Sequence, residues 1–469
     1  MKSSSLRLIV VSTFALVLSL IYPSKAQKLF KDGDKVCFLG NSITKHGGFH
    51  HYLALFYATR YPNQKIEIIN SGIGGDKTEH VLARMHDDAL IHQPNWVVLK
   101  LGMNDVAKLM YTDSAYARPT IDKERKEMME TYKQNYEKIV HNLLSSKAKL
   151  ILQTPTIYDE TVYLPHLKGV IGRNVGLKEA GKYVKDLAKQ YNLPVVDYWQ
   201  VMMDVTKRMQ KIKPTASLVV GDRTHPTPQG HFVMAYQFLK TTKADPHVFS
   251  IKVKANRKRM RIVRSNAKIF DSFGNDNGVS FNVLEKSLPF PMPKGVSEVL
   301  DFVPFEKELN QELLMVKGLT KGIYTLKIDG ISIANYTAAE LATGVNIASI
   351  ATTPQQQQAQ KVLKLFEEYW ELEAVIRYVR STEINRLKPL GIESLQEVSS
   401  YIAKAKASEK DTTKKSYKEL LDLQDNYVPA KMDWSKTLAR MEKLHHLIYQ
   451  ANEPIPHRFE IVKKELAQE

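Results

Sequence analysis

The most constraining feature of this sequence is an alternation of short apolar runs with helical patterns between residues 28 and 243. The apolar runs occupy residues 35–39, 65–70, 96–101, 149–153 and 193–197. Between them, apolar residues recur with a helical period near residues 48–60, 78–91, 124–146 and 176–190, and a last helical pattern covers 227–242. Strands that are apolar throughout and separated by helices are typical of a parallel sheet covered on both faces. We therefore expect an α/β domain built on a parallel sheet.

The pattern changes after residue 245. Short strand-like runs with turn sequences between them extend from 246 to 350, and the turn Asp329-Gly330 between two such runs predicts a hairpin. From 351 to 469 the chain is rich in Leu, Lys, Glu and Ala, with helical patterns at 355–380, 394–406, 410–425 and 434–450. We expect an α/β domain at 27–245, a β-rich accessory region at 246–350 and a helical C-terminal region at 351–469.

Residues 1–26 have the features of a secretory signal peptide. A positively charged start precedes an apolar run at 8–22, and the small residues Ser24 and Ala26 suit cleavage before Gln27. The run is shorter than the roughly 18 residues that a membrane-spanning helix needs. We expect a secreted or periplasmic protein with no integral membrane span after cleavage; an uncleaved anchor is the alternative.

The chain is basic, with 67 Lys and Arg against 50 Asp and Glu and a formal net charge of +17. Without residues 1–26 the charge falls by three, to +14. The densest basic cluster, 252–264, alternates charged and apolar residues in part, as a strand with a basic exposed face does. No zinc-finger or RNA-binding signature accompanies the charge, so we expect no nucleic-acid partner. The single cysteine, Cys37, excludes an intramolecular disulfide and paired-cysteine zinc sites.

Four short polar segments lie near the ends of predicted elements, where open parallel sheets build their sites. They are residues 40–44 (GNSIT), 70–76 (NSGIGGD), 102–105 (GMND) and 222–226 (DRTHP). A Ser that directly follows a strand exposes its hydroxyl, clustered glycines let backbone N–H groups point into a cleft, and an Asn amide can bind a negatively charged oxygen. An Asp three residues before a His can orient the imidazole. Taken singly, each segment is weak evidence, because a turn or a helix cap explains it as well, and a Ser in this place is more often a helix cap.

Together and in this order, the four segments resemble the sequence blocks of the SGNH hydrolases, also called the GDSL lipase/esterase family. The matching residues are Ser42, Gly75, Asn104, Asp222 and His225. Asn41 stands where the first block of the family usually has Asp. The resemblance covers residues 30 to about 242, roughly half of the chain.

This resemblance implies a flavodoxin-like three-layer α/β/α fold and a serine ester hydrolase without a cofactor or a metal ion. Ser42 would be the nucleophile, His225 its general base and later the general acid, and Asp222 the carboxylate that orients His225. The oxyanion hole would consist of the backbone N–H groups of Ser42 and Gly75 and the side-chain amide of Asn104.

The expected activity is hydrolysis of O-acyl esters, with O-acetyl groups on polysaccharides as the first choice, because the chain has no long apolar lid segment near the site. A lysophospholipase or lipase is the second hypothesis, and a non-catalytic glycan-binding protein that retained the fold is the third. Thioesterase or small-peptide protease activity is also open. The partner is thus an acylated carbohydrate or a lipid ester, and the sequence leaves the oligomeric state open.

Other polar residues near these segments have less reactive interpretations. His46 and His50 are four residues apart on a predicted helix, a spacing that suits a metal, but no third ligand is evident and a helix-surface role is favoured. His231 is expected to pack in the first turn of the closing helix. Loop bracing is the expected role of three further residues: Asp76, Thr78 and Asp105.

The role of the chain after residue 245 has three interpretations. It could shape the substrate cleft, bind carbohydrate or a cell surface, or only stabilise the enzyme. Tyr369 and Trp370 lie in an amphipathic helical pattern, where an aromatic residue is typical of the core rather than of a sugar platform.

Overall fold

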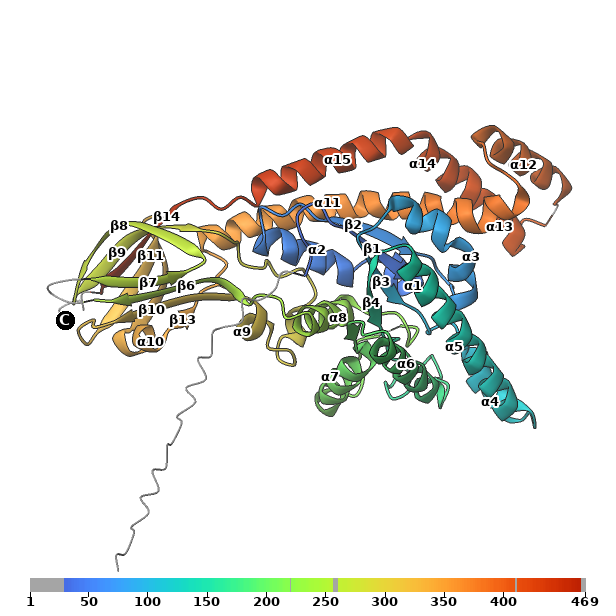
Figure 1. Cartoon of the computed structure of the whole chain (residues 1–469), viewed down its shortest axis with the longest axis horizontal. Coiled ribbons are helices and arrows are strands. Elements are labelled where there is room, and N and C mark those ends of the chain that lie inside the picture. The colour runs from blue at the N-terminus through green and yellow to red at the C-terminus, as the bar shows by residue number, and fades with distance from the viewer. Residues whose placement is uncertain (1–28, 220, 256–259, 410, 465–469) are drawn as a thin grey trace, which may run out of the picture.

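The structure is a computed structural model that describes residues 29–464 except 220, 256–259 and 410. The expected signal peptide lies outside these residues. The chain forms a central α/β part, a β-rich part at one end and a layer of long helices that runs along the α/β part (Figure 1). Within the described residues, no helix is both long and apolar enough to cross a membrane.

The α/β part is built on a parallel five-stranded sheet. Its strands are β1 (Lys35–Gly40), β2 (Glu67–Gly72), β3 (Trp96–Lys100), β4 (Lys149–Gln153) and β5 (Val195–Val196), in the order β2-β1-β3-β4-β5. This is the flavodoxin-like order, so the predicted fold class is confirmed. Gly40 pairs with Gly72 on one side and with Lys100 on the other. The carboxyl ends of the three neighbouring strands therefore meet at one edge.

Helices cover both faces of this sheet, with α2 packed against α8 and α3 against α5. The helices are α1 (Ser42–Lys45), α2 (Phe49–Arg60), α3 (Thr78–Asp88), α4 (Asp113–Tyr116), α5 (Ile121–Ser145), α6 (Arg173–Gln190), α7 (Tyr198–Ile212) and α8 (Pro228–Thr241). The five predicted helices agree with α2, α3, α5, α6 and α8 to within a few residues. The sequence analysis missed α7, although its buried residues Met202, Val205 and Met209 have helical spacing.

The β-rich part contains two sheets that share one hydrophobic core. One sheet has the order β13 (Val345–Asn346), β10 (Gln311–Lys317), β6 (His247–Lys254), β7 (Arg261–Ser265). The other has the order β12 (Ile331–Thr337), β11 (Ile323–Ile328), β14 (His457–Lys463), β9 (Gly278–Glu285), β8 (Ala267–Asn275). The short helices α9 (Phe305–Leu309) and α10 (Ala338–Thr343) connect strands. The predicted hairpin around Asp329 is the pair β11 and β12.

Of the basic cluster at 252–264, residues 252–254 lie on β6 and residues 261–264 on β7, while residues 256–259 lie outside the described residues. In β6, Lys252 and Lys254 are exposed, while Ile251 and Val253 are buried. The two lysines of β6 thus occupy its solvent face, as the alternation predicted, whereas in β7 Val263 is exposed as well as the two arginines.

The helical layer consists of α11 (Pro354–Thr382), α12 (Leu395–Ser408), α13 (Lys415–Asp422), α14 (Val428–Met432) and α15 (Trp434–Ala451). A π-helical turn, η4 (Glu383–Leu387), follows α11, and a second one, η6 (Leu423–Tyr427), follows α13. In Figure 1, α11 runs along α2 and β2, and α15 lies on α11. Phe366 and Ile448 of these two helices join the core of the α/β part. Tyr369 and Trp370 also pack against it, as predicted.

Strand β14 follows the helical layer in the chain but lies between β9 and β11 in the β-rich part. The helical layer therefore starts and ends at the same β-rich part. The sequence analysis predicted no strand beyond residue 450. The run at 457–463 is short and single, and its pairing with distant strands leaves no signal in the local sequence.

The insertion of β14 predicts unequal effects for two neighbouring residues. Ile461 is fully buried between the two sheets, whereas the side chain of Val462 is 45% exposed. We expect Ile461→Ala to lower the free energy of unfolding by about 2–5 kcal/mol, because it leaves a cavity in the core. The control Val462→Ala should cost much less. Urea unfolding followed by circular dichroism measures both, and equal losses would contradict the assignment of β14 to this sheet.

Candidate active site

Ser42 is the first residue of α1 and comes two residues after the end of β1. The turn between strand and helix is held by Asn41, whose side-chain oxygen accepts a hydrogen bond from the N–H of Ile43 at 3.2 Å. Because β1 is flanked by strands on both sides, this turn places the half-buried Ser42 at the carboxyl edge of the sheet.

His225 and Asp222 lie beside Ser42, although 183 positions separate Ser42 from His225 in the chain. The Nε2 atom of His225 is 2.8 Å from the Oγ atom of Ser42. Its Nδ1 atom contacts one carboxylate oxygen of Asp222, and the other oxygen accepts the backbone N–H of His225 at 2.9 Å. This pattern assigns the ring proton to Nδ1 and leaves Nε2 free to accept the Ser42 proton.

Asp222 is half exposed, with 52% of its side chain accessible. Partial burial raises its pKa, but hydrogen bonds from the backbone and ring of His225 and from the N–H of Thr224 outweigh this and hold the pKa of Asp222 below its usual value. The carboxylate therefore stays ionised at neutral pH and can hold the imidazole in place through its Nδ1 atom.

Gly75 and Asn104 follow β2 and β3, the two strands on either side of β1. The φ angle of Gly75 is 83°, in the left-handed region that favours glycine. Among the described residues, the N–H groups of Gly75 and Ser42 have no hydrogen-bond partner. The side-chain amide of Asn104 donates to the carbonyl of Asp76 at 2.9 Å, which orients it and leaves its second N–H available. The edge that carries Ser42 thus also offers three N–H donors.

The loops that carry these donors are braced as the sequence predicted. Asp105 accepts hydrogen bonds from the backbone N–H of Thr78 at 2.8 Å, from its hydroxyl at 2.7 Å and from the N–H of Gly102 at 3.1 Å. Asp76 accepts from the Nε atom of Arg84 at 2.6 Å. Both carboxylates are thereby occupied by structural contacts.

A buried ion-pair network lies beneath the site. Arg84 donates to the carbonyl oxygens of Gly40 and Ser71, both at 3.0 Å, and pairs with Asp88. Arg377 of α11 donates to both carboxylate oxygens of Asp88 at 2.8 Å. The side chains of the three ions are at most 4% exposed. The sequence analysis missed them, because charged residues in amphipathic helices are usually exposed.

Arg223 fixes the segment that carries the Asp and His residues of the site. It is buried and has a φ angle of 66°, which is uncommon for a residue other than glycine. Its guanidinium donates to the carbonyl oxygens of Asp159 at 3.0 Å, Val162 at 2.9 Å and Leu167 at 2.7 Å. No spacing in the sequence indicated this role.

Lys100 is a buried cation behind Ser42. Its Nζ atom is 3.3 Å from the side-chain oxygen of Asn41, and the residue is 1% exposed. Burial lowers the pKa of Lys100 to about 7, because no carboxylate compensates for the lost hydration. The sequence analysis included Lys100 in a strand and assigned it no role.

The histidines that follow Ser42 differ in their surroundings. The ring of His46 lies 5.3 Å from that of His225, and burial together with the proximity of His225 lowers the pKa of His46. The predicted surface position is wrong for His50, which is fully buried. It faces β1, where its ring stacks on Phe38, and its Nε2 atom lies 3.0 Å from the carbonyl of Thr44. Burial is also the main cause that lowers the pKa of His50 to about 4.

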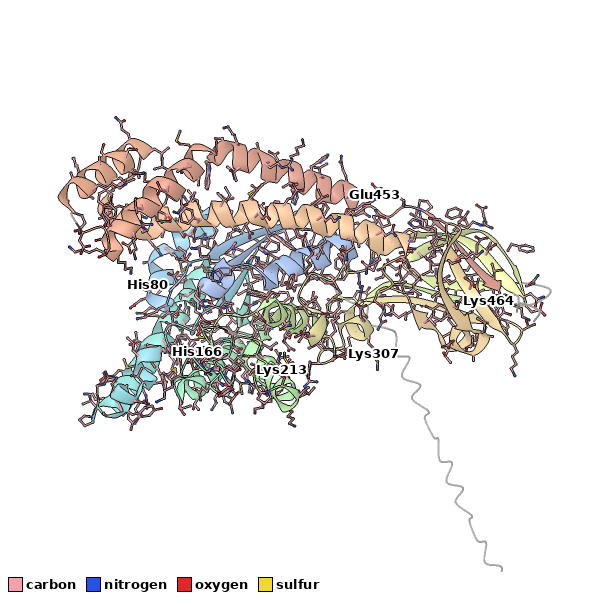
Figure 2. The ribbon with its side chains drawn as sticks, turned by 180° about the vertical axis from the view of Figure 1, so that it is seen from behind. His80, His166, Lys213, Lys307, Glu453 and Lys464 are labelled. Atoms are coloured by element: carbon pink, nitrogen blue, oxygen red, sulfur yellow. The ribbon has the colours of Figure 1, made fainter. Side chains whose placement is uncertain are left out.

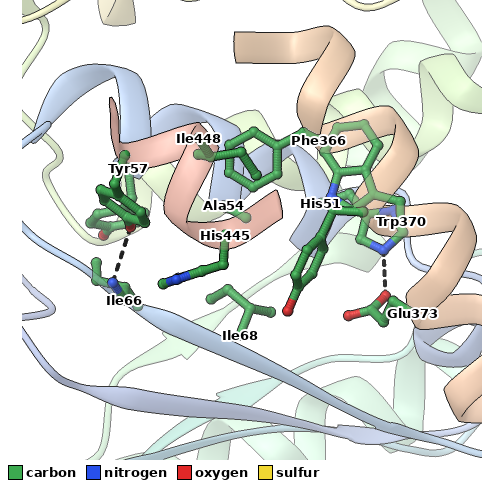
Figure 3. Close-up of a pocket in the computed structure, with 12 residues that line it drawn as sticks. His51, Ala54, Tyr57, Ile66, Ile68, Phe366, Trp370, Glu373, His445 and Ile448 are labelled. Carbon is green, nitrogen blue, oxygen red and sulfur yellow. Dashed lines mark hydrogen bonds and ion pairs between the residues drawn. The ribbon is translucent and has the colours of Figure 1, made fainter. Parts of the chain in front are cut away.

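His51 faces Glu373 of α11 beside a small cavity of about 30 Å³ (Figure 3). With His50, these residues place three possible metal-ligand atoms within 4.8 Å of one another. However, Nδ1 of His51 accepts the N–H of Gly48 at 3.3 Å, which assigns the ring proton to Nε2. That proton points to Glu373 at 2.6 Å. The hydrogen bonds thus favour a neutral imidazole that donates to Glu373 over metal binding.

His231 is buried in the first turn of α8, where it was predicted to pack. Its ring stacks on Phe49, and its Nδ1 atom accepts the N–H of Phe49 at 3.2 Å.

Residues 38–232 match the model of the GDSL-like lipase/acylhydrolase family. A solved structure of a gut microbial diltiazem-metabolizing enzyme is 28% identical, with a TM-score of 0.83 over 94% of this chain and 99% of that chain. An acetylxylan esterase of Geobacillus stearothermophilus is 26% identical over 223 residues, which are 44% of this chain and 93% of the relative. An uncharacterized lipoprotein of Bacillus subtilis, YqeF, is 25% identical over 35% of this chain and 69% of its own.

The environment of Lys100 predicts a pH-dependent gain of stability for Lys100→Met. Between pH 7 and the ordinary lysine pKa of about 10.4, the unfolded chain binds more protons at this position than the folded chain. The buried lysine therefore destabilises the fold fully below pH 7 and progressively less as the pH rises to 10. Lys100→Met should raise the melting temperature more at pH 6 than at pH 9, as measured by calorimetry.

The exposed Lys149 at the start of β4 provides the control for this experiment. Lys149→Met should change the melting temperature by the same small amount at pH 6 and at pH 9. If Lys100→Met shifted the melting temperature equally at pH 6 and at pH 9, Lys100 would not be a buried cation that titrates in this range.

Proposed function

We propose that this chain is a secreted serine esterase that removes O-acetyl groups from carbohydrate. The premise is that residues 38–232 belong to the GDSL-like lipase/acylhydrolase family, which makes the chain a carboxylic ester hydrolase. The observation that carries the proposal is the contact of 2.8 Å between Ser42 and His225, with Asp222 on the far side of the imidazole. These residues have the order nucleophile, base and orienting acid.

In the acylation step, Oγ of Ser42 attacks the ester carbonyl carbon while Nε2 of His225 takes the hydroxyl proton. The carbonyl oxygen becomes negatively charged, and the N–H groups of Ser42 and Gly75 and the amide of Asn104 donate to it. His225 then gives its proton to the leaving alcohol, and the acyl group stays on Ser42.

In the deacylation step, a water molecule takes the place of the alcohol. His225 accepts a proton from this water as it attacks the acyl carbon, and the same three donors bind the oxyanion. When the intermediate collapses, His225 returns the proton to Ser42 and the carboxylic acid leaves. Asp222 keeps the imidazole in one tautomer and stabilises its charged form in both steps.

The choice of acetyl esters rests on the relatives. One is named an acetylxylan esterase and aligns over 93% of its own length. The solved structure with the same overall architecture is named for metabolizing diltiazem, which makes diltiazem a useful test compound beside acetylated sugars. Secretion rests on the features of residues 1–26, and the similarity to a protein named as a lipoprotein supports a location at or outside the cell envelope.

Hydrolysis of p-nitrophenyl esters from acetate to laurate tests this function. We expect the highest kcat/KM on acetate and loss of nearly all activity in Ser42→Ala, because the nucleophile is removed. A preference for laurate would indicate a lipase or lysophospholipase instead. Absence of hydrolysis, together with glycan binding that Ser42→Ala leaves unchanged, would indicate a binding protein.

The assignment of Asn104 to the oxyanion hole predicts a separate effect. Asn104→Ala should lower kcat on p-nitrophenyl acetate by about 10²–10³ with little change in KM, because the lost donor acts on charge that develops in the transition state. The exposed Asn142 on α5 is a matched control, and Asn142→Ala should retain the parental rate. An unchanged kcat in Asn104→Ala would remove this residue from the mechanism.

A further inference from the structure

A cavity of about 680 Å³ lies between the glycine loop after β2 and the turn that follows α11. Gly74 and Gly75 line one side, and Ile384, Asn385 and Pro389 belong to the opposite side. Gly75 carries one of the proposed oxyanion donors, so the cavity borders one side of the proposed site, whereas Ser42, Asn104 and His225 are not among its lining residues. The helical layer lies outside the residues that match the family model, and it lines this cavity together with Gly75.

The segment of the helical layer that lines the cavity departs locally from a regular α-helix. After 29 residues of α11 the chain makes the π-helical turn η4, and Pro389 soon follows. Such turns inside helices often occur at functional sites, because the wider turn redirects side chains. Here the buried Leu387 anchors the turn, and Asn385 is exposed on it.

The charges around this cavity are already paired. Asp76 accepts from the Nε atom of Arg84 at 2.6 Å, and Lys388 forms an ion pair with Asp87. A phosphate or carboxylate group entering the cavity would therefore have to displace Asp87 from Lys388 or meet the carboxylate of Asp76. These pairs favour a neutral ligand over an anionic one.

The remaining side chains suit a neutral, hydroxyl-rich ligand. Among the described residues, the amide of Asn385 has no hydrogen-bond partner, so it can both donate to and accept from hydroxyl groups. His80, which Figure 2 shows at the surface, adds an imidazole whose side chain is 51% exposed. Ala83, Ile384 and Pro389 add small apolar patches. Sugars present the same combination of hydroxyl groups and apolar C–H faces.

We propose that this cavity is a subsite for the alcohol part of the substrate, and that it binds the unmodified units of a neutral acetylated oligosaccharide with Asn385 as a specificity-determining residue. This inference rests on the proposed esterase function and adds where the sugar chain lies. A substrate with an acetyl group on a small alcohol would use the reacting site alone, whereas a longer sugar would also gain contacts with η4.

The test compares two substrates, acetylated xylotriose and p-nitrophenyl acetate. Asn385→Trp places an indole in the cavity, so the ratio of kcat/KM for acetylated xylotriose to that for p-nitrophenyl acetate should fall at least tenfold. Asn385→Ala removes only the amide and should lower the ratio about threefold. This smaller variant keeps the test valid if the indole of Asn385→Trp disturbs folding. Asn426 is a matched control, since it is also exposed on a π-helical turn, η6, and does not line the cavity. Asn426→Trp should leave the ratio unchanged.

An unchanged ratio in both Asn385 variants would overturn the subsite. The proposed function fails in a different way: the parent would release no acetate from acetylated xylotriose, would prefer an acyl lysophospholipid, or would keep its activity in Ser42→Ala.

Discussion

The buried pairing of Asp88 with Arg84 and Arg377 is the interaction on which the geometry of the site depends. Arg84 holds the carbonyl groups at the ends of β1 and β2 and also the carboxylate of Asp76 in the glycine loop. Burial raises the pKa of Asp88, but the two guanidinium groups outweigh it and keep that pKa below its usual value, so the network stays charged. Buried ions are costly to desolvate, and breaking such a pair typically costs about 3–5 kcal/mol. The network therefore resists rearrangement of the strand ends that carry Ser42 and Gly75.

One member of this network, Arg377, comes from α11, 289 positions after Asp88 in the chain. The helical layer is thus tied to the α/β part by a buried charge as well as by apolar packing and the His51–Glu373 pair. Because β14 returns to the β-rich part, the layer is also anchored at both of its ends. These contacts favour a structural role in shaping the cleft over a detachable binding module.

The parts of this molecule that could be predicted from the sequence are those whose signal is local. Apolar runs identified all five strands of the parallel sheet, and short polar segments at their ends identified Ser42 and its neighbours before any distance was known. Arg84, Arg377 and Arg223 could not be identified, because a buried arginine has the same local pattern as an exposed one. His50 was placed wrongly for a related reason, since α2 is covered on more than one side and a helix pattern does not reveal how many faces are buried.

The replacement of the usual Asp by Asn41 is explained by its neighbour. A carboxylate at position 41 would lie close to the Nζ atom of Lys100 and would form a buried ion pair behind Ser42, the proposed nucleophile. The neutral amide accepts from both Lys100 and the N–H of Ile43, and it leaves Lys100 with a pKa of about 7. Asn41 thus leaves the buried lysine without a carboxylate partner, in line with its lowered pKa. The side-chain oxygen of Asn41 therefore links the turn that carries Ser42 to Lys100 without placing a carboxylate in this buried region.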